Sequence, residues 1–114
     1  MLLYYGMLRK DNLEDAYNIA SDFLDGEALD AFSSENDMNF AYKLGVYEGA
    51  NLMLSYLYDM EDATDSDLEI VDMRLRIYRK NMETMLEKMH MDKSFNYFEG
   101  MTFSINLIGD LIQE

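Results

Sequence analysis

Hydrophobic residues recur three or four positions apart along most of the chain, the spacing that places them on one face of an α-helix. Four segments show this pattern, at about residues 11–26, 38–59, 66–89 and 94–112. No segment alternates β-branched and polar residues as a half-buried strand does, and the chain contains no proline. The sequence therefore predicts an all-α protein, with a single domain spanning residues 1–114.

Capping and helix-breaking residues separate these segments. Gly26 is expected to end or kink the first helix, and the stretch "SSEND" offers capping residues before the second. Ser66 followed by Glu69 fits a capping box that opens the third helix. The third helix has the most regular pattern, a heptad seam expected to face another helix, formed by Leu68, Val71, Leu75, Tyr78, Met82, Met85 and Met89.

The second and fourth segments share a pattern. The stretches "FAYKLGVYEGANLMLSYL" (residues 40–57) and "FNYFEGMTFSINLIGDLI" (residues 95–112) match at five positions that lie 55 residues apart. One interpretation is a duplicated helical hairpin, at about residues 11–59 and 66–112, whose two similar copies close as a four-helix bundle with approximate two-fold symmetry. The other interpretation is a chance match between two amphipathic helices rich in methionine and tyrosine.

Small and polar residues inside these two segments are candidates for helix packing. Gly45 and Gly49 form a G-x-x-x-G pair, and Gly100 occupies the position equivalent to Gly45. Because each glycine costs a helix roughly 1 kcal/mol relative to alanine, we expect a neighbouring helix to approach closely there. Asn51 and Asn106 are also equivalent and lie on apolar stripes. They either face each other and fix the register of the two hairpins, or lie at the boundary and bind water.

The opening "LYYG" and a later aromatic-x-x-G-x-x-x-G-A-x-L-M pattern resemble an uncharacterised family of short helical proteins of Gram-positive bacteria and their phages and mobile elements. The later pattern is carried by Tyr42, Gly45, Gly49, Ala50, Leu52 and Met53. The resemblance covers the first half of the chain. The chain as a whole is longer and more acidic than the members of that family. It implies a bacterial or phage setting, and it implies no activity.

Acidic residues dominate the charge and are unevenly distributed. The net charge is −14, and residues 1–72 carry all of it, with 17 acidic and three basic residues, whereas residues 73–114 carry six of each. Such a field repels nucleic acid and anionic lipid and attracts basic protein surfaces. The residues predicted to meet a partner are Asp11, Glu14, Asp15, Asp22 and Asp25, with Asp59, Glu61, Asp62 and Asp65 as a second cluster.

Other features of the composition bear on the compartment. The chain has no cysteine, and its start is apolar for only eight residues, with charges that follow rather than precede them, unlike a secretion signal. It contains no uncharged apolar run of about 20 residues, the length needed to span a membrane. We therefore expect a cytoplasmic protein without membrane contact, and the resemblance implies that the cell is a bacterial host.

The sequence shows no complete catalytic or metal-binding pattern. His90 is the only histidine, and although Glu87 precedes it at the Glu-x-x-His spacing of di-metal bundles, the second such motif is missing. An EF-hand loop starting at Asp65 lacks the required glycine and glutamate, so only a loose cation near residues 59–69 stays open. We expect neither an enzyme nor a cofactor or metal site.

A basic cluster, Arg74, Arg76, Arg79 and Lys80, either neutralises acidic residues of the first helix or serves a partner. Two functions are compatible with these patterns. The first is a non-enzymatic binding module whose acidic face engages a basic, nucleic-acid-binding protein surface, as a phage-type, anti-CRISPR-like inhibitor that mimics nucleic acid. The alternative is a structural or regulatory bundle that self-associates, for example as a homodimer, through Leu2, Leu3, Tyr4 and Tyr5 with the G-x-x-x-G helix. For any single acidic residue, a role in solubility alone stays open.

Overall fold

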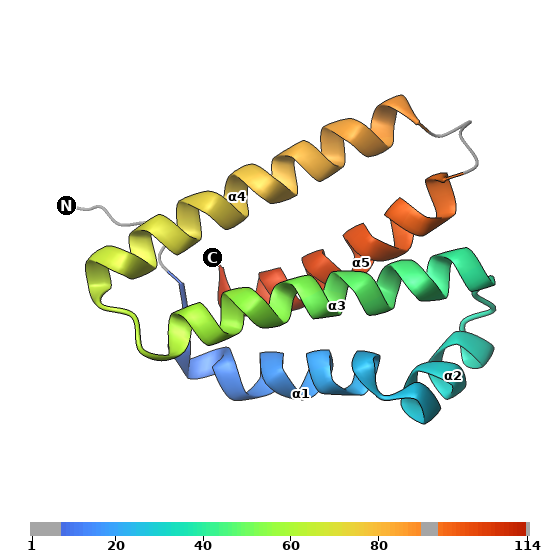
Figure 1. Ribbon diagram of the computed structural model, residues 1–114, viewed down its shortest axis with the longest axis horizontal. Helices are drawn as coiled ribbons and strands as arrows, with labels where there is room; N and C mark the ends of the chain where they lie inside the picture. The colour runs from blue at the N-terminus through green and yellow to red at the C-terminus, as the bar shows by residue number, and fades with distance from the viewer. Residues whose placement is uncertain (1–7, 90–93, 114) are drawn as a thin grey trace.

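The computed structural model describes residues 8–89 and 94–113 and is drawn in Figure 1. A short 3-10 helix, η1 (Lys10–Asn12), precedes five α-helices. These are α1 (Leu13–Leu24), α2 (Gly26–Glu35), α3 (Phe40–Glu61), α4 (Asp65–Lys88) and α5 (Phe95–Ile112). The described residues form no strand, which confirms the predicted all-α class.

The number of helices differs from the prediction because the first segment divides at Asp25. The N–H of Asp25 donates to the carbonyl oxygen of Asp22 and closes α1. Its side-chain Oδ1 accepts hydrogen bonds from the N–H groups of Glu27 and Ala28, at 2.9 and 3.2 Å, and opens α2. The predicted break at Gly26 is therefore confirmed, but residues 8–89 and 94–113 form five α-helices where the four-helix bundle needs four.

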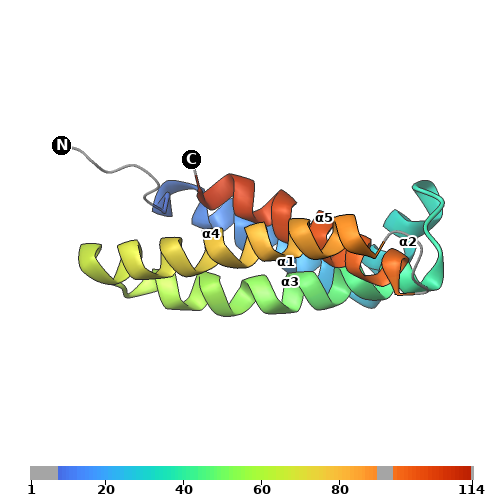
Figure 2. The ribbon, with the colours of Figure 1, turned by 90° about the horizontal axis from the view of Figure 1, so that it is seen from above.

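The parallel helices α3 and α5 form the centre of the molecule (Figures 1 and 2). A Cβ atom on Gly45 would overlap the backbone carbonyl oxygen of Tyr97, and one on Gly100 would overlap that of Tyr42. The two contacts are reciprocal, because Gly100 stands 55 positions after Gly45 and Tyr97 stands 55 positions after Tyr42. Gly49, one turn further along α3, is also crowded by α5. This close approach agrees with the packing role expected of the three glycines.

Helices α1 and α4 flank the central pair and run antiparallel to it. They cover the apolar side chains that α3 and α5 direct inward, and the burial of this apolar surface stabilises the fold. The largest fully buried side chains are Met53, Leu57, Met60, Leu75, Ile105, Ile108 and Ile112. In α1, Ala16 and Ala20 are completely buried, and such small residues let α1 lie close to its neighbours.

The heptad seam predicted for α4 faces the core over most of its length. Leu68, Val71, Leu75 and Met82 are buried, whereas the Met85 side chain is 37% exposed. The seam is therefore confirmed in the first turns of α4 and becomes more accessible toward the end of the helix.

A cluster of aromatic rings holds α2 against the rest of the protein. The ring centroids of Phe23 in α1 and Phe32 in α2 lie 5.3 Å apart, and Phe103 of α5 lies within 6.3 Å of both. Contacts between aromatic rings at such distances are favourable beyond the area they bury. Contacts of its Phe32 ring with Phe23 and Phe103 thus hold the short helix α2 in place.

Helices α3 and α4 begin at capping residues other than those predicted. Thr64 Oγ1 accepts from the N–H of Asp67 at 3.2 Å, so α4 begins before the predicted capping box at Ser66. Asn39 Oδ1 accepts from the N–H of Tyr42 at 2.8 Å and caps α3. The cap therefore lies two residues after the "SSEND" stretch, whose residues were expected to supply it. In both cases a side-chain oxygen satisfies a backbone donor that the first helical turn leaves free.

Candidate protein-binding site at the acidic end

The start of α1, the end of α3 and the start of α4 meet at one end of the molecule, on the left in Figure 1. Tyr17 in α1 donates its hydroxyl hydrogen to Glu61 Oε2 in α3, at 2.7 Å. Lys10 Nζ donates to the backbone carbonyl oxygens of Glu61 and Ala63, at 3.4 and 3.3 Å. These contacts hold η1 and the start of α1 against the connection between α3 and α4.

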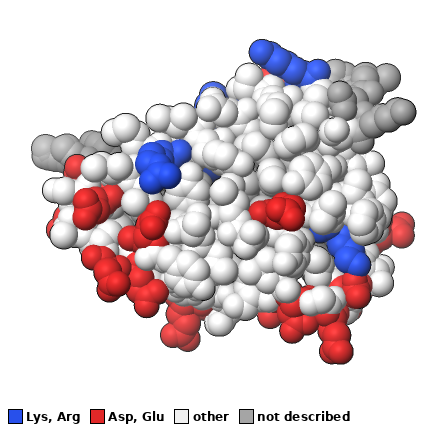
Figure 3. All heavy atoms as spheres, viewed as in Figure 1, with Lys and Arg blue, Asp and Glu red and all other residues white. Residues whose placement is uncertain are grey.

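This meeting point gathers seven of the nine acidic residues predicted to bind a partner, and we call them the acidic end. They are Asp11, Glu14, Asp15, Asp59, Glu61, Asp62 and Asp65, and all are exposed. Figure 3 shows acidic side chains crowded at this end and along the lower edge of the molecule. Three residues of the first predicted cluster and all four of the second, distant in sequence, therefore lie at the same end of the molecule.

The other two predicted residues lie elsewhere. Asp22 and Asp25 are exposed near the far end of α1, away from the acidic end. Asp25 already accepts two backbone hydrogen bonds as the cap of α2, which gives it a structural role. The structure thus separates these two residues from the rest of the predicted face.

Tyr17, at the acidic end, has a strongly raised pKa. Burial, followed by the hydrogen bond to Glu61 and the negative charge of that carboxylate, raises the pKa of Tyr17 from 10.0 to about 12. The phenol, which is protonated at neutral pH, donates a hydrogen bond to Glu61, and the raised pKa keeps it protonated well above pH 10. This bond holds one carboxylate of the acidic end in a defined position.

The seven carboxylates of the acidic end come from separate elements and are all exposed. No group of three or more carboxylate or histidine side chains among residues 8–89 and 94–113 is arranged to hold a metal ion. His90, the one candidate for acid–base chemistry, lies outside the described residues. The acidic end is thus an exposed, negatively charged surface.

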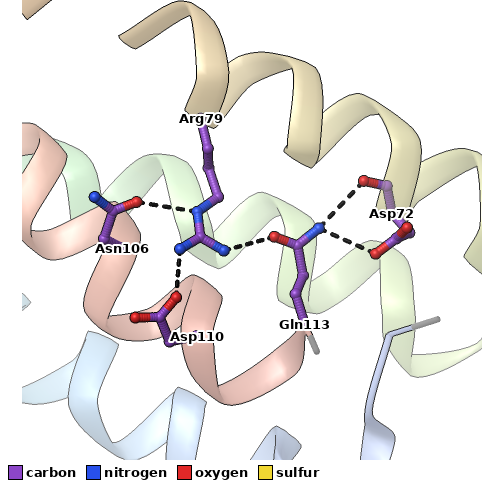
Figure 4. Close-up of polar contacts among 5 residues, drawn as sticks. All are labelled: Asp72, Arg79, Asn106, Asp110 and Gln113. Carbon is purple, nitrogen blue, oxygen red and sulfur yellow. Dashed lines mark hydrogen bonds and ion pairs between the residues drawn. The ribbon is translucent and has the colours of Figure 1, made fainter. Parts of the chain in front are cut away.

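Sequence reasoning missed a polar network that joins α4 to α5 (Figure 4). Arg79 Nε donates to Asn106 Oδ1 at 3.0 Å, Nη1 donates to Gln113 Oε1 at 2.7 Å, and Nη2 pairs with Asp110. A Cβ atom on Gly109 would lie 2.9 Å from Nη1, so the glycine leaves room for the guanidinium group. Arg79 therefore bonds to α5 and not to the first helix.

The same network contains a buried carboxylate. Gln113 Nε2 donates to Asp72 Oδ1 at 3.0 Å and to the Asp72 carbonyl oxygen at 3.2 Å, while Arg76 Nε donates to Oδ2 at 2.9 Å. Asp72 and Gln113 are each more than 90% buried, and burial makes such bonds costly to break. The signal in the sequence was the polar Asp72 beside the heptad seam, with Arg76 one turn later.

Asn51 and Asn106, which were predicted either to face each other or to bind water, lie on different sides of the α3–α5 pair. Asn51 is exposed on the outer side of α3, while Asn106 accepts a hydrogen bond from Arg79. The prediction that they pair is wrong, because Gly45 and Gly49 occupy the face of α3 that contacts α5. Asn51 agrees with the alternative in which the amide bonds to water.

Among the described residues, no helix combines the length and the apolar character needed to cross a membrane. No protein-family model matches the chain, and no curated protein or solved structure is significantly similar to it. The function must therefore be argued from the surfaces of the molecule itself.

Proposed function

We propose that this chain is a non-enzymatic binding protein whose acidic end engages a basic, nucleic-acid-binding surface of another protein. The observation that carries the proposal is the convergence of seven exposed carboxylates from three separate parts of the chain at one end. Charges gathered in this way create a local negative potential that attracts a basic surface and steers its approach. The same potential repels DNA and RNA, so the partner is a protein and not a nucleic acid.

The concrete form of the proposal is an inhibitor that mimics nucleic acid. Carboxylates displayed on helix ends occupy the positions where a nucleic-acid-handling protein would otherwise bind phosphates. The resemblance to proteins of phages and mobile elements supports a host defence protein as the target, in the manner of an anti-CRISPR inhibitor. The proposed setting is the cytoplasm of a bacterial host cell.

Two variants with equal charge change test the role of the acidic end. The test variant carries Asp11→Asn, Asp15→Asn and Asp62→Asn, and the control carries Glu27→Gln, Glu35→Gln and Glu83→Gln, which are exposed away from that end. Each is immobilised and used to capture proteins from a host-like bacterial lysate at low salt. We expect wild type and control to capture the same basic protein and the test variant to lose it. Equal capture by both variants would contradict a role for the acidic end.

The alternative function, a self-associating structural or regulatory bundle, is favoured by one observation. Large apolar side chains, including Phe40, Tyr47 and Tyr58, are exposed on the side of α3 that faces away from α5. Gly45 and Gly49 are buried against α5, so self-association would use this outer side and not the G-x-x-x-G face. Residues 2–5, the other predicted contributors, lie outside the described residues.

We also propose that the chain is built from two similar hairpins, one of α1 and α3 and the other of α4 and α5, paired as a four-helix bundle with α2 added to the first connection. The reciprocal contacts of Gly45 with Tyr97 and of Gly100 with Tyr42 support this proposal. A two-fold axis between parallel helices relates such a pair of contacts to each other.

A further inference from the structure

Helix α3 carries a second apolar face, directed away from the core. Phe40, Leu44, Tyr47 and Tyr58 are 75, 40, 39 and 61% exposed. Together with the exposed Asn51 and the half-buried Leu54, they form what we call the outer seam. An exposed apolar patch of this kind marks a surface that another molecule covers.

The outer seam has the spacing of a coiled coil. Its six residues follow one another at intervals of 4, 3, 4, 3 and 4 positions. In heptad notation, Leu44, Asn51 and Tyr58 occupy a positions, and Phe40, Tyr47 and Leu54 occupy d positions. The seam extends over about 27 Å of helix, from the usual rise of 1.5 Å per residue.

Both the shape and the charge of this side of the molecule allow a second helix to approach. In Figure 2, α3 runs along the lower margin of the view, and α4 and α5 lie above it. Figure 3 shows few charges in the middle of this side, one acidic side chain near the centre and one basic side chain to its right, whereas acidic side chains crowd the left and lower margins. Between residues 40 and 58 the only charged side chains are Lys43 and Glu48, which have opposite signs.

We propose that two copies of this chain pair through the outer seams of α3 as a parallel, two-fold symmetric coiled coil. A helix face that is uncharged along its seam is complementary to itself, as a two-fold interface requires. Asn51 supplies the polar a position that specifies two-stranded, in-register pairing, because it meets Asn51 of the second copy. The occupant is thus a second copy of the chain.

The flanking charges distinguish parallel from antiparallel pairing. Lys43 is at a g position and Glu48 at the e position five residues later, the two positions that meet between chains of a parallel coiled coil. Lys43 also pairs with Asp30 in α2 of its own chain. Antiparallel pairing about the middle of the seam would instead bring Glu48 next to Glu48 of the second copy, and like charges repel.

Net charge sets the conditions under which the pairing forms. Each copy carries a charge of −14, and parallel pairing brings both acidic ends to the same end of the dimer. Added salt screens this repulsion while leaving the apolar seam intact, so the dimer strengthens as salt increases. This dependence is opposite in sign to that of the proposed acidic contact with a basic partner, so the two proposals can fail separately.

Cysteine cross-linking of the full chain tests the pairing. The chain has no natural cysteine, so Asn51→Cys introduces a single thiol at the centre of the seam. The control, Asn18→Cys, places a thiol on the exposed side of α1. Under mild oxidation at high salt, we expect the Asn51→Cys protein to form a disulfide-linked dimer at least about tenfold faster than the control, since pairing raises the effective concentration of the thiols. Equal rates would overturn the parallel arrangement.

Sedimentation over a concentration series at high salt provides the second measurement. Tyr47→Glu buries a charge in the seam and should raise the dissociation constant at least about tenfold. Ile77→Glu is the matched control, because Ile77 is 55% exposed on α4 and lies outside the seam. We expect the control to dimerise as the wild type does, with both variants keeping their helical circular dichroism. A wild-type protein that stays monomeric at all concentrations, or a Tyr47→Glu variant that dimerises like the control, would overturn the proposal.

Discussion

Replacing Gly45 with alanine tests the close contact between α3 and α5. An added Cβ atom would overlap the carbonyl oxygen of Tyr97 and would lie 2.7 Å from the backbone nitrogen of Met101. Both are backbone atoms, so neither can move without displacing α5. The helices must separate, and the apolar contacts along the pair weaken as they do.

The expected magnitude combines two opposing effects. Alanine favours the helix over glycine by about 1 kcal/mol. Overpacking a close-packed contact costs about 1–3 kcal/mol and occasionally more, and a backbone clash belongs at the upper end. We therefore expect Gly45→Ala to lower the free energy of unfolding by about 2 kcal/mol. For a chain of this size, that corresponds to a melting temperature lower by roughly 8 °C or more.

Two other glycines serve as graded controls in the same thermal and urea unfolding experiments. No atom lies within 4 Å of a Cβ built on Gly26, so Gly26→Ala should stabilise the protein by about 0.4–1 kcal/mol. At Gly109 the added Cβ would meet only the movable side chain of Arg79, so the loss should be smaller than at Gly45. The reasoning would be refuted if Gly45→Ala were as stable as Gly26→Ala.

Three further substitutions test individual interactions. Arg79→Met removes three hydrogen-bond donors from the α4–α5 network and should lower the free energy of unfolding in urea by about 1–3 kcal/mol. The control is Lys80→Met, because Lys80 forms only an exposed ion pair with Glu83, at 3.9 Å, and its loss should change stability by less than about 0.5 kcal/mol. Because the raised pKa of Tyr17 favours the folded state only while the phenol is protonated, this stabilisation is complete below pH 10 and is lost as pH rises toward about 12. Tyr17→Phe should therefore flatten the decline in stability over that interval, and an unchanged slope would show that the hydrogen bond is unimportant. Asp25→Ala removes the cap of α2 and should cost about 1 kcal/mol, with Asp22→Ala, at an exposed position in the last turn of α1, as a control that should cost less.

Local patterns in the sequence predicted the helices well. The spacing of apolar residues located α1, α3, α4 and α5, and the G-x-x-x-G pair at Gly45 and Gly49 indicated where a helix would approach closely. These features depend on residues within a few turns of one another, so they are visible in sequence. The extra helix α2 arises from a single capping residue, Asp25, next to the predicted break.

The orientation of α3 could not be predicted from its pattern. This helix is apolar on two sides, one with Gly45 and Gly49 and the other with Phe40 and Tyr47. Either side could have faced the core by periodicity alone. The glycine side is buried because only there can the backbone of α5 approach, and this leaves Asn51 exposed instead of paired.

Polar contacts between residues distant in the sequence could not be predicted either. Arg79 was assigned either to the acidic residues of the first helix or to a partner, since neither helix spacing nor charge shows which helix lies opposite. In the structure it reaches Asn106 and Gln113, which stand 27 and 34 positions later. The acidic end could not be predicted from the sequence for the same reason, because its carboxylates come together only when α1 meets the connection between α3 and α4.

Competition with DNA is the measurement that tests the proposed function most directly. The wild-type protein is loaded with the protein that it captures from a host-like bacterial lysate at low salt, and duplex DNA or sodium chloride is then added in steps. If the acidic end occupies a nucleic-acid-binding surface, DNA should release the captured protein, and salt should weaken the binding steeply because both surfaces are charged. A captured protein that stays bound in excess DNA and at high salt would contradict the account.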